Sequence, residues 1–344
     1  MHSREEPPSS DATVDSAPPA VSGGVSVVVP VHNGADLVVR CLASVPEWAE
    51  VVVVDDASTD GAPELVERRF PRARLLRNER NRGFGATANA GLRVATGAVR
   101  VVLNSDARLR PGALEELAAV FEDPGVGIAG SRLVFPDGSH QTSANRFPTV
   151  GGLLAGSFAL NELYRRLRPH GRFRWEMGLS AADHGADRDV DWVMGACIAI
   201  RDRCLEATGG FDESIFMYGE EIDLCWRARR EGWRVRHASR SVVEHEGGGS
   251  HADVASTAPL VLRGEAAFFR RAYGSGTLRR WWWSRILGAG AKVLAFGFAS
   301  PFDRRCRTRL RWQWAALRFL AGPGRDLVAP TEQARTDGPV APAA

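Results

Sequence analysis

The chain has 344 residues, of which 44% are hydrophobic and 25% are charged, and its formal net charge is +3. This composition is typical of a globular protein and excludes a wholly disordered chain. The charge is uneven, because residues 261–320 hold thirteen basic and two acidic side chains, a net of +11, which leaves −8 for the remainder. We therefore expect an anionic partner for the C-terminal part.

Both ends of the chain are predicted to be disordered. Residues 1–24 are rich in Ser, Pro, Asp and Glu and show no signal peptide, and residues 323–344 have a similar composition. The number of cysteines, five, is odd, and no two have Cys-x-x-Cys spacing. Buried free thiols in a reducing compartment are therefore expected, which indicates a cytoplasmic protein.

Apolar strands alternate with helical patterns in the first half of the chain. The predicted strands are Val25–Val31, Glu50–Val54, Ala73–Leu76 and Val99–Leu103. The predicted helices are Ala35–Val45, Pro63–Phe70, Gly85–Ala95 and Gly112–Phe121. This alternation predicts a parallel sheet with helices on both faces, whose ligands bind at the carboxyl ends of the strands.

Polar motifs follow the first two of these strands. Pro30, His32 and Asn33 end the first strand, and Asp56 opens the acidic turn after the second. A carboxylate at this position can accept hydrogen bonds from a nucleotide base or a ribose. A helix cap with a turn would use the same residue types, so both interpretations stay open.

The segment Asn81-Arg82-Gly83 opens the helix that contains Asn89. The residues from Gly83 to Ala88 fit the dinucleotide fingerprint G-x-G-x-x-[GA], which would suggest an NAD-dependent oxidoreductase. The fingerprint should follow the first strand directly, and here it does not. A simpler interpretation is that backbone N–H groups at this helix start meet a diphosphate.

Acidic residues recur further along the chain. Asn104 and Asp106 follow the fourth strand, where a carboxylate over a diphosphate suits Mg²⁺ or Mn²⁺, although a strand-ending turn is the alternative. Glu220, Glu221 and Asp223 begin a predicted helix that ends at Arg230. Such acids also stabilise a helix start, and Asp223 is spaced to pair with Arg227.

One histidine stands out near the end of this region. A strand is predicted at Ser241–Val243, and His245 follows it, before the glycine run at residues 247–249. A lone histidine is usually structural. Its place before a glycine loop makes a ligand role equally reasonable.

Seven segments, in order, resemble the inverting glycosyltransferases of family 2, most of all their bacterial rhamnosyltransferase-like branch. They are VSVVVPVHNG, VVVVDDASTDG, NRGFGATANAG, LNSDARL, VDWVMGACIAIR, GGFDESIFMYGEEIDLCWRARREGW and VVEHEGGGS. The resemblance implies a GT-A fold, which is α/β with a mainly parallel sheet and helices on both faces, plus a C-terminal helical extension. The implied domains are 25–255 (a nucleotide-sugar half, 25–130, and an acceptor half, 131–255) and 256–322.

The resemblance also implies roles for individual residues. The residues expected beside the nucleotide-sugar are Pro30, His32, Asn33, Asp56, Asn81, Arg82, Gly83, Asn89, Asn104 and Asp106. Asp106 and His245 would bind the metal, and Glu221 would be the catalytic base. The residues expected at the acceptor site are Trp192, Gly195 and Asp223.

Two positions depart from the family pattern. Asn104 stands where the first acid of the metal motif is usual, which leaves Asp106 as the main carboxylate. Glu221 stands where Asp is usual, and its extra methylene leaves open that Glu220 takes the base role instead. The implied reaction is a single displacement that inverts the anomeric carbon.

Residues 256–322 form a basic, tryptophan-rich extension with five of the ten tryptophans. Its apolar run Ile286–Ala299 has fourteen residues, too few for a spanning helix, which needs about 20. Tryptophan and arginine around such a run are typical of an interfacial helix, and helices packed on the catalytic domain are the alternative. A nucleic-acid partner is not expected.

The favoured hypothesis is an enzyme at the inner face of the plasma membrane. It would transfer a sugar, L-rhamnose in the first instance, from a dTDP- or UDP-sugar to a saccharide or lipid-linked acceptor of the cell envelope. The two alternatives are a non-catalytic membrane-associated scaffold and, less favoured, an NAD-dependent oxidoreductase.

Overall fold

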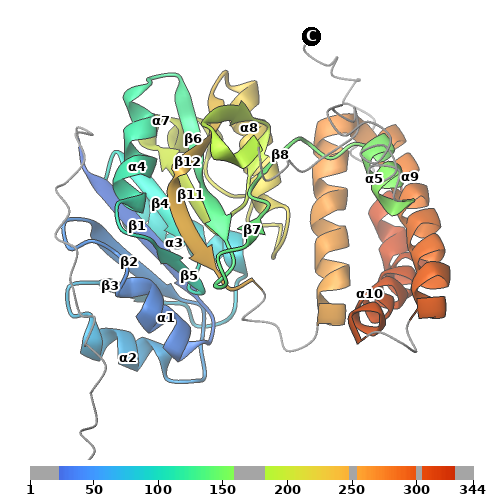
Figure 1. The fold of residues 1–344 in the computed structure, drawn as a ribbon, viewed down its shortest axis with the longest axis horizontal. Helices are drawn as coiled ribbons and strands as arrows, with labels where there is room; N and C mark the ends of the chain where they lie inside the picture. Colours follow the sequence, from blue (N-terminus) through green and yellow to red (C-terminus); the bar gives the residue numbers. More distant parts are fainter. Residues whose placement is uncertain (1–22, 159–182, 248–253, 300–303, 330–344) are drawn as a thin grey trace, which may run out of the picture.

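The computed structural model describes residues 23–158, 183–247, 254–299 and 304–329, and it shows an α/β domain beside a group of helices (Figure 1). Within these residues the α/β domain is built on a ten-stranded sheet with the main strand order β3-β2-β1-β4-β11-β6-β12-β5. Most of the two predicted tails, 1–24 and 323–344, lies outside the described residues, which leave out 1–22 and 330–344.

Four neighbouring parallel strands form one half of the sheet: β1 (Val25–Val31), β2 (Glu50–Asp55), β3 (Arg74–Arg77) and β4 (Val99–Leu103). They agree with the predicted strands to within one residue at each end. Every residue of β1 is buried. An apolar run of this kind is what a parallel strand with helices on both faces requires.

The helices of this half also lie near their predicted positions: α1 (Ala35–Leu42), α2 (Ala62–Arg69), α3 (Phe84–Val94) and α4 (Ala113–Ala119), the last followed by η1 (Val120–Glu122). The predicted end of α1 at Val45 is wrong. Val45 precedes Pro46, and a residue before proline disfavours the helical conformation, so α1 stops earlier.

Helices cover both faces of the sheet. The buried side chains of α1, α2 and α4 form one hydrophobic cluster with alternate strand residues such as Val27, Val29 and Val53. The other alternate set, including Val28 and Val52, packs against α3, α7 (Asp202–Thr208) and α8 (Glu220–Arg230). The observed start and end of α8 match the prediction.

The second half of the sheet is mixed. Its strands are β5 (Ala107–Leu109), β6 (Val126–Val134), β7 (His140–Gln141), β9 (Arg188–Val190), β11 (Cys197–Arg201) and β12 (Arg234–His245), while β8 (Ala144–Asn145) and β10 (Trp192–Val193) pair separately. A short helix, η2 (Asp183–Gly185), precedes β9. Strand β11 runs antiparallel between β4 and β6. The predicted strand Ser241–Val243 is only part of β12, which ends at His245.

A third hydrophobic core lies in the helical part of the molecule. It is built from α5 (Val150–Ser157), η3 (Val254–Thr257), α9 (Ala258–Ala299), α10 (Arg304–Ala321) and η4 (Pro323–Val328). Phe268, Phe269 and Trp281 are fully buried in it. Helix α9 is kinked at Gly274, where φ is 76°. The C-terminal disordered tail was predicted to begin at residue 323, which is too early. Residues 323–328 form η4, and Leu327 packs on this core.

All five cysteines are free, as predicted. Four of them are buried and Cys306 is half-buried. Burial raises the pKa of Cys197 and of Cys204 to about 12, so these two thiols stay protonated and unreactive near neutral pH.

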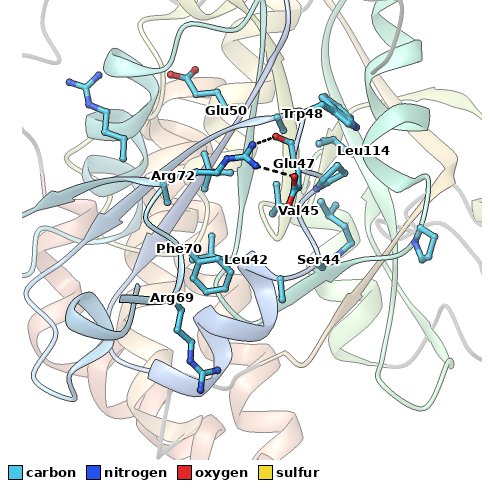
Figure 2. A pocket seen from close by; sticks show the side chains of 18 of the residues that line it. Leu42, Ser44, Val45, Glu47, Trp48, Glu50, Arg69, Phe70, Arg72 and Leu114 are labelled. Atoms are coloured by element: carbon cyan, nitrogen blue, oxygen red, sulfur yellow. Dashed lines mark hydrogen bonds and ion pairs between the residues drawn. The ribbon is translucent and has the colours of Figure 1, made fainter. Parts of the chain in front are cut away.

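A hollow of about 1130 Å³ opens at the amino ends of β2 and β3 (Figure 2). Arg72 reaches across it and pairs with Glu47 at 3.1 Å. Phe70 and Trp48 contribute apolar surface to its wall. This hollow lies at the opposite end of the strands from the polar motifs of the sequence.

Three histidines meet edge to face at the edge of the sheet, with ring centroids 4.3 Å apart for His140 and His184 and 4.9 Å apart for His184 and His237. Burial lowers the pKa of His237 to about 4. Burial also lowers the pKa of His140, with His184 and Arg132 acting in the same direction. Folding therefore makes His237 and His140 harder to protonate than exposed histidines.

We expect the free energy of unfolding to fall as the pH falls. Unfolded histidine takes up a proton near pH 6.5, whereas folded His237 does so only near pH 4. The contribution of His237 to the free energy of unfolding is therefore complete above about pH 6.5 and is lost as the pH falls toward 4. The loss due to His237 is up to about 3 kcal/mol. Urea unfolding at about pH 7.5 and about pH 5 measures it. The variant H237Q should show a weaker pH dependence, and an unchanged dependence would contradict this account.

Candidate active site

The predicted site residues gather where β1, β2 and β4 end. The backbone N–H of Asn104, just after β4, donates to the carbonyl of Ala196 at 3.0 Å and fixes this end against the segment before β11. Gly195, in that segment, lies beside the start of α8, since a Cβ at Gly195 would be 3.7 Å from the Cβ of Glu221. Segments far apart in sequence therefore meet at one edge of the sheet.

The loops after β1 and β2 are fastened to each other. Pro30 is buried within β1. The Nδ1 of His32 donates to the carbonyl of Asp56 at 2.8 Å, and Nε2 takes no part in this bond. The Oδ1 of Asn33 accepts from the N–H of Thr59 at 2.9 Å, and Asn33 has a φ of 62°. These side chains hold the loops in place as well as lining the edge.

The carboxylate of Asp56 is buried and fully engaged. It accepts from the N–H of Arg82 at 2.9 Å, from the N–H of Gly83 at 3.1 Å and from the Nδ2 of Asn78 at 2.8 Å. The sequence predicted that the backbone N–H groups at the start of α3 bind a diphosphate. In the structure those of Arg82 and Gly83 donate to Asp56, and that of Phe84 donates to the carbonyl of Phe216. Asp56 therefore shapes the loop before α3.

Two further predicted residues make bonds within the protein. The amide of Asn89 donates to the carbonyl of Phe211 at 2.9 Å and to Glu213 at 3.1 Å, and its oxygen accepts from the N–H of Phe211. Arg82 pairs with the same Glu213 at 2.9 Å. Asn89 is buried. These bonds join α3 to the segment that leads to α8, so Asn89 fixes the position of that segment. Asn81 accepts from the N–H of Gly83 at 3.0 Å.

Asp106 and His245 face each other across the ends of β4 and β12. The Nε2 of His245 is 3.3 Å from the Oδ1 of Asp106, and both side chains are mostly buried. The Nδ1 of His245 donates to the Oε1 of Gln141 at 3.1 Å. Gln141 thereby orients the ring so that Nε2 faces Asp106, and a hydrogen bond of this kind to the other ring nitrogen is usual for a metal-binding histidine.

This pair fits a divalent cation. The Oδ1 of Asn104 is buried and has no hydrogen-bond partner among the described residues, and the Nδ2 of the same amide lies 3.5 Å from the Nε2 of His245. The carboxylate of Asp106, the imidazole of His245 and the amide group of Asn104 therefore lie together. The described residues contain no group of three or more His, Cys, Asp or Glu able to hold a metal. The remaining ligands would be oxygens of a bound diphosphate.

Two adjacent acids begin α8. Glu220 is buried, and its Oε2 has no hydrogen-bond partner in the described part of the chain. Burial, reinforced by the charge of Glu221, raises the pKa of Glu220 well above its usual value. Glu221 is half-buried, its pKa is also raised by burial, and its Oε2 accepts from the N–H of Gly219 at 3.1 Å.

The acids at α8 and the metal pair belong to one site. Burial raises the pKa of Tyr218, and the charges of Glu220, Asp106 and Glu221 raise it further. The bond from the N–H of Asn104 to the carbonyl of Ala196, at 3.0 Å, and the nearness of Gly195 to Glu221 bring the end of β4 and the start of α8 together. Such a concentration of perturbed acids is typical of a catalytic site.

The three predicted acceptor residues lie in different surroundings. Gly195 lies beside Glu221 and Phe84. Trp192 donates its indole N–H to a backbone carbonyl at 2.9 Å. Asp223 is only 1% exposed and is paired with Arg227 at 2.8 Å and with Arg271 of α9 at 2.9 Å. The predicted pairing with Arg227 is therefore confirmed, and Asp223 is covered by arginines.

Sequence reasoning missed Gln141 and Arg271. Gln141 lies 104 positions from the histidine that it orients. Arg271 lies 48 positions from Asp223, in a segment whose many arginines conceal it. No local spacing signals either contact.

Comparisons with known proteins identify the family of the chain. The model for glycosyl transferase family 2 matches residues 26–195. The N-acetylglucosaminyl-diphospho-decaprenol L-rhamnosyltransferase of Mycobacterium tuberculosis is 32% identical over 221 residues, which cover 60% of this chain and 69% of that protein. The chain belongs to glycosyltransferase family 2.

This family 2 glycosyltransferase has other relatives of the same kind. The pre-mycofactocin glycosyltransferase of M. tuberculosis is 30% identical over 278 residues, 73% of this chain and 53% of that protein. The mannosyltransferase of Pyrobaculum calidifontis, solved with GDP-mannose and Mn²⁺, has a TM-score of 0.54 at 20% identity and covers 91% of each chain. This likeness confirms the GT-A fold. Because the chain belongs to glycosyltransferase family 2, the oxidoreductase hypothesis is wrong.

Proposed function

We propose that the chain is an inverting, metal-dependent rhamnosyltransferase that uses dTDP-L-rhamnose and a saccharide carried on a polyprenyl diphosphate. The observation that carries the reaction is the meeting of Asp106, His245 and Glu221 at one edge of the sheet. The relative named above as an L-rhamnosyltransferase acting on a diphospho-decaprenol supports the donor and the acceptor class. The proposed division of labour is residues 25–130 for the nucleotide-sugar, 131–255 for the acceptor and 256–322 for the extension.

The acid–base chemistry assigns different states to the two glutamates. Glu220 is the more deeply buried, and burial raises its pKa well above the usual value because it disfavours the charged form. Glu221, half-buried beside Gly195, takes the proton from the acceptor hydroxyl. A base with a raised pKa accepts this proton more readily.

The donor lies on the other side of the site in this proposal. Asp106, His245 and the amide of Asn104 would hold Mg²⁺ or Mn²⁺, and a divalent cation there would supply positive charge to offset that of the diphosphate. His32 and Asn33 lie along the nucleotide. The acceptor oxygen attacks the anomeric carbon from the face opposite the diphosphate, the bond to the diphosphate breaks, and the configuration is inverted.

A thermal-shift experiment tests the donor. A ligand that binds only the folded protein raises its melting temperature. We expect dTDP and dTDP-L-rhamnose with Mn²⁺ or Mg²⁺ to stabilise the protein, and the same ligands with EDTA to do so much less. Stronger stabilisation by UDP or GDP would reassign the donor. Absence of stabilisation by every nucleoside diphosphate would contradict the proposal.

Attachment to a membrane surface also belongs to this proposal. Among the described helices none offers an apolar stretch long enough to cross a bilayer. Trp283, Leu287 and Leu294 are 58%, 57% and 69% exposed. Their spacing of four and seven residues places them on one side of α9, where Arg280 is exposed as well. An apolar stripe beside arginines suits an anionic lipid surface.

The triple variant W283A/L287A/L294A should bind vesicles containing anionic lipid at least about tenfold more weakly, because each lost side chain removes up to about 1.5–3 kcal/mol of burial. Deletion of the extension would be a poor test, because it removes most of the third hydrophobic core and exposes the side chains of α5 and α8 that pack on it. Sedimentation with phosphatidylglycerol vesicles measures binding, and nucleotide-dependent thermal shift controls for folding. Unchanged sedimentation would contradict the membrane surface.

A further inference from the structure

Helix α9 of the extension lies directly against the turn that precedes the proposed base. A Cβ at Gly264 would lie 1.6 Å from the carbonyl oxygen of Tyr218, and a Cβ at Gly219 would lie 3.1 Å from the backbone of Gly264. Tyr218 and Gly219, the two residues of the turn, have left-handed backbone conformations with φ of 68° and 97°. The helix backbone and the turn backbone are therefore in contact, and the turn holds an uncommon conformation beneath the helix.

Arg271 makes a second contact two helical turns further along α9. One of its nitrogens is 2.9 Å from a carboxylate oxygen of Asp223, in the first turn of α8. Another pairs with Asp212, in the segment that leads to α8. One guanidinium thus joins both ends of the segment 212–223, which contains Glu220 and Glu221.

The contact of Arg271 with Asp212 and Asp223 pairs one cation with two largely buried carboxylates. Asp223 is 1% exposed and Asp212 is 16% exposed, whereas Arg271 is 38% exposed. Buried carboxylates need a paired cation, and removal of the partner is costly. Hydrogen bonds from Ser214, together with Arg271, keep the pKa of Asp212 low in spite of its burial. Arg227 pairs with Asp223 from α8 itself, so Arg271 supplies the contact that reaches into the extension.

The apolar side of α8 is also covered by the extension. Ile222 and Trp226 pack against the third core. The base-bearing helix therefore has one side on the sheet and the other on α9. Its position relative to Asp106 depends on both surfaces.

We propose that Arg271 is a positioning residue for the base Glu221, and that through Asp212 and Asp223 the helical extension sets the distance from the base to the donor site. This inference rests on the proposed function. Arg271 itself touches no substrate. Misplacement of a reacting group by about 1 Å costs on the order of 100-fold in rate. Loss of the Arg271 contacts is therefore expected to lower the rate of transfer.

The test uses the full-length protein, dTDP-L-rhamnose and a short-chain N-acetylglucosaminyl-diphospho-prenol. We expect R271Q to lower kcat by about 10- to 100-fold, with the donor KM within about twofold of wild type. The matched control is R270Q, which removes the neighbouring arginine, whose guanidinium bonds the carbonyl of Leu327 in η4. R270Q should keep wild-type kcat. R271K should recover part of the loss, because it keeps the charge without the two-pronged geometry.

The outcomes separate the inference from the function on which it rests. Transfer by wild type and R270Q, with R271Q equally active, would overturn the inference alone. A rise in the donor KM of R271Q without loss of kcat would also overturn it. Loss of nucleotide-dependent stabilisation in both R271Q and R271K would show that the arginine maintains the fold, which again overturns the inference. No transfer by wild type would overturn the proposed function instead.

Discussion

Replacement of Glu221 by glutamine is expected to lower sugar transfer by about 10²- to 10⁴-fold and to leave nucleotide binding nearly unchanged. Glutamine keeps the shape of the side chain and loses the ability to accept a proton. The structure places Glu221 beside Gly195, on the half-exposed side of the α8 start, and its raised pKa suits a base. Initial rates with saturating donor and acceptor measure the effect, and thermal shift by dTDP with Mn²⁺ tests binding. Wild-type-like turnover of E221Q would overturn the assignment.

The matched control is the neighbouring residue. Glu220 is buried and burial raises its pKa well above the usual range, so the uncharged amide of E220Q removes only a charge that burial already disfavours. We expect E220Q to lose less than about tenfold in kcat. The opposite result, with E220Q inactive and E221Q active, would exchange the two roles.

Replacement of Asp106 by asparagine is expected to abolish metal-dependent stabilisation by dTDP and to lower kcat by about 10²- to 10³-fold, since charge neutralisation by the metal contributes several kcal/mol. Asparagine keeps the side-chain shape while removing its charge. His245 and Asn104 alone would leave a site without a carboxylate. Thermal shift across a series of Mn²⁺ concentrations measures the loss.

The control for this substitution is D137N. Asp137 is exposed in the turn after β6, and its pKa is lowered by hydrogen bonds from Ser139. This variant removes the same charge away from the site and should keep wild-type metal dependence. If D106N retained metal-dependent stabilisation equal to that of D137N, the metal site would lie elsewhere.

Sequence pattern predicted the elements of the first half well, and the reason is local. Apolar runs such as Val25–Val31 are buried on both faces, so their composition alone marks them as central strands. The arrangement of the second half was less accessible. Strand β11 runs antiparallel between β4 and β6, a pairing between segments about 70 to 100 positions apart that no local pattern specifies.

The candidate site shows the same division. The order of the motifs indicated the family and the residues at the ends of β1, β2 and β4. The bonds of Asp56 and Asn89 could not be foreseen, because their partners are backbone groups placed by the fold. An acid that looks ready to bind a ligand in the sequence can be fully occupied by N–H groups in the structure.

The sequence by itself determined the GT-A fold class, the family and the acids at the start of α8, since these depend on local composition and on motif order. Only the tertiary structure decided that Gln141 orients His245, that the amide of Asn104 lies beside this histidine, and that Arg271 joins α9 to α8. The physical reason is that hydrogen bonds and ion pairs act over about 3 Å in space, whatever the separation along the chain.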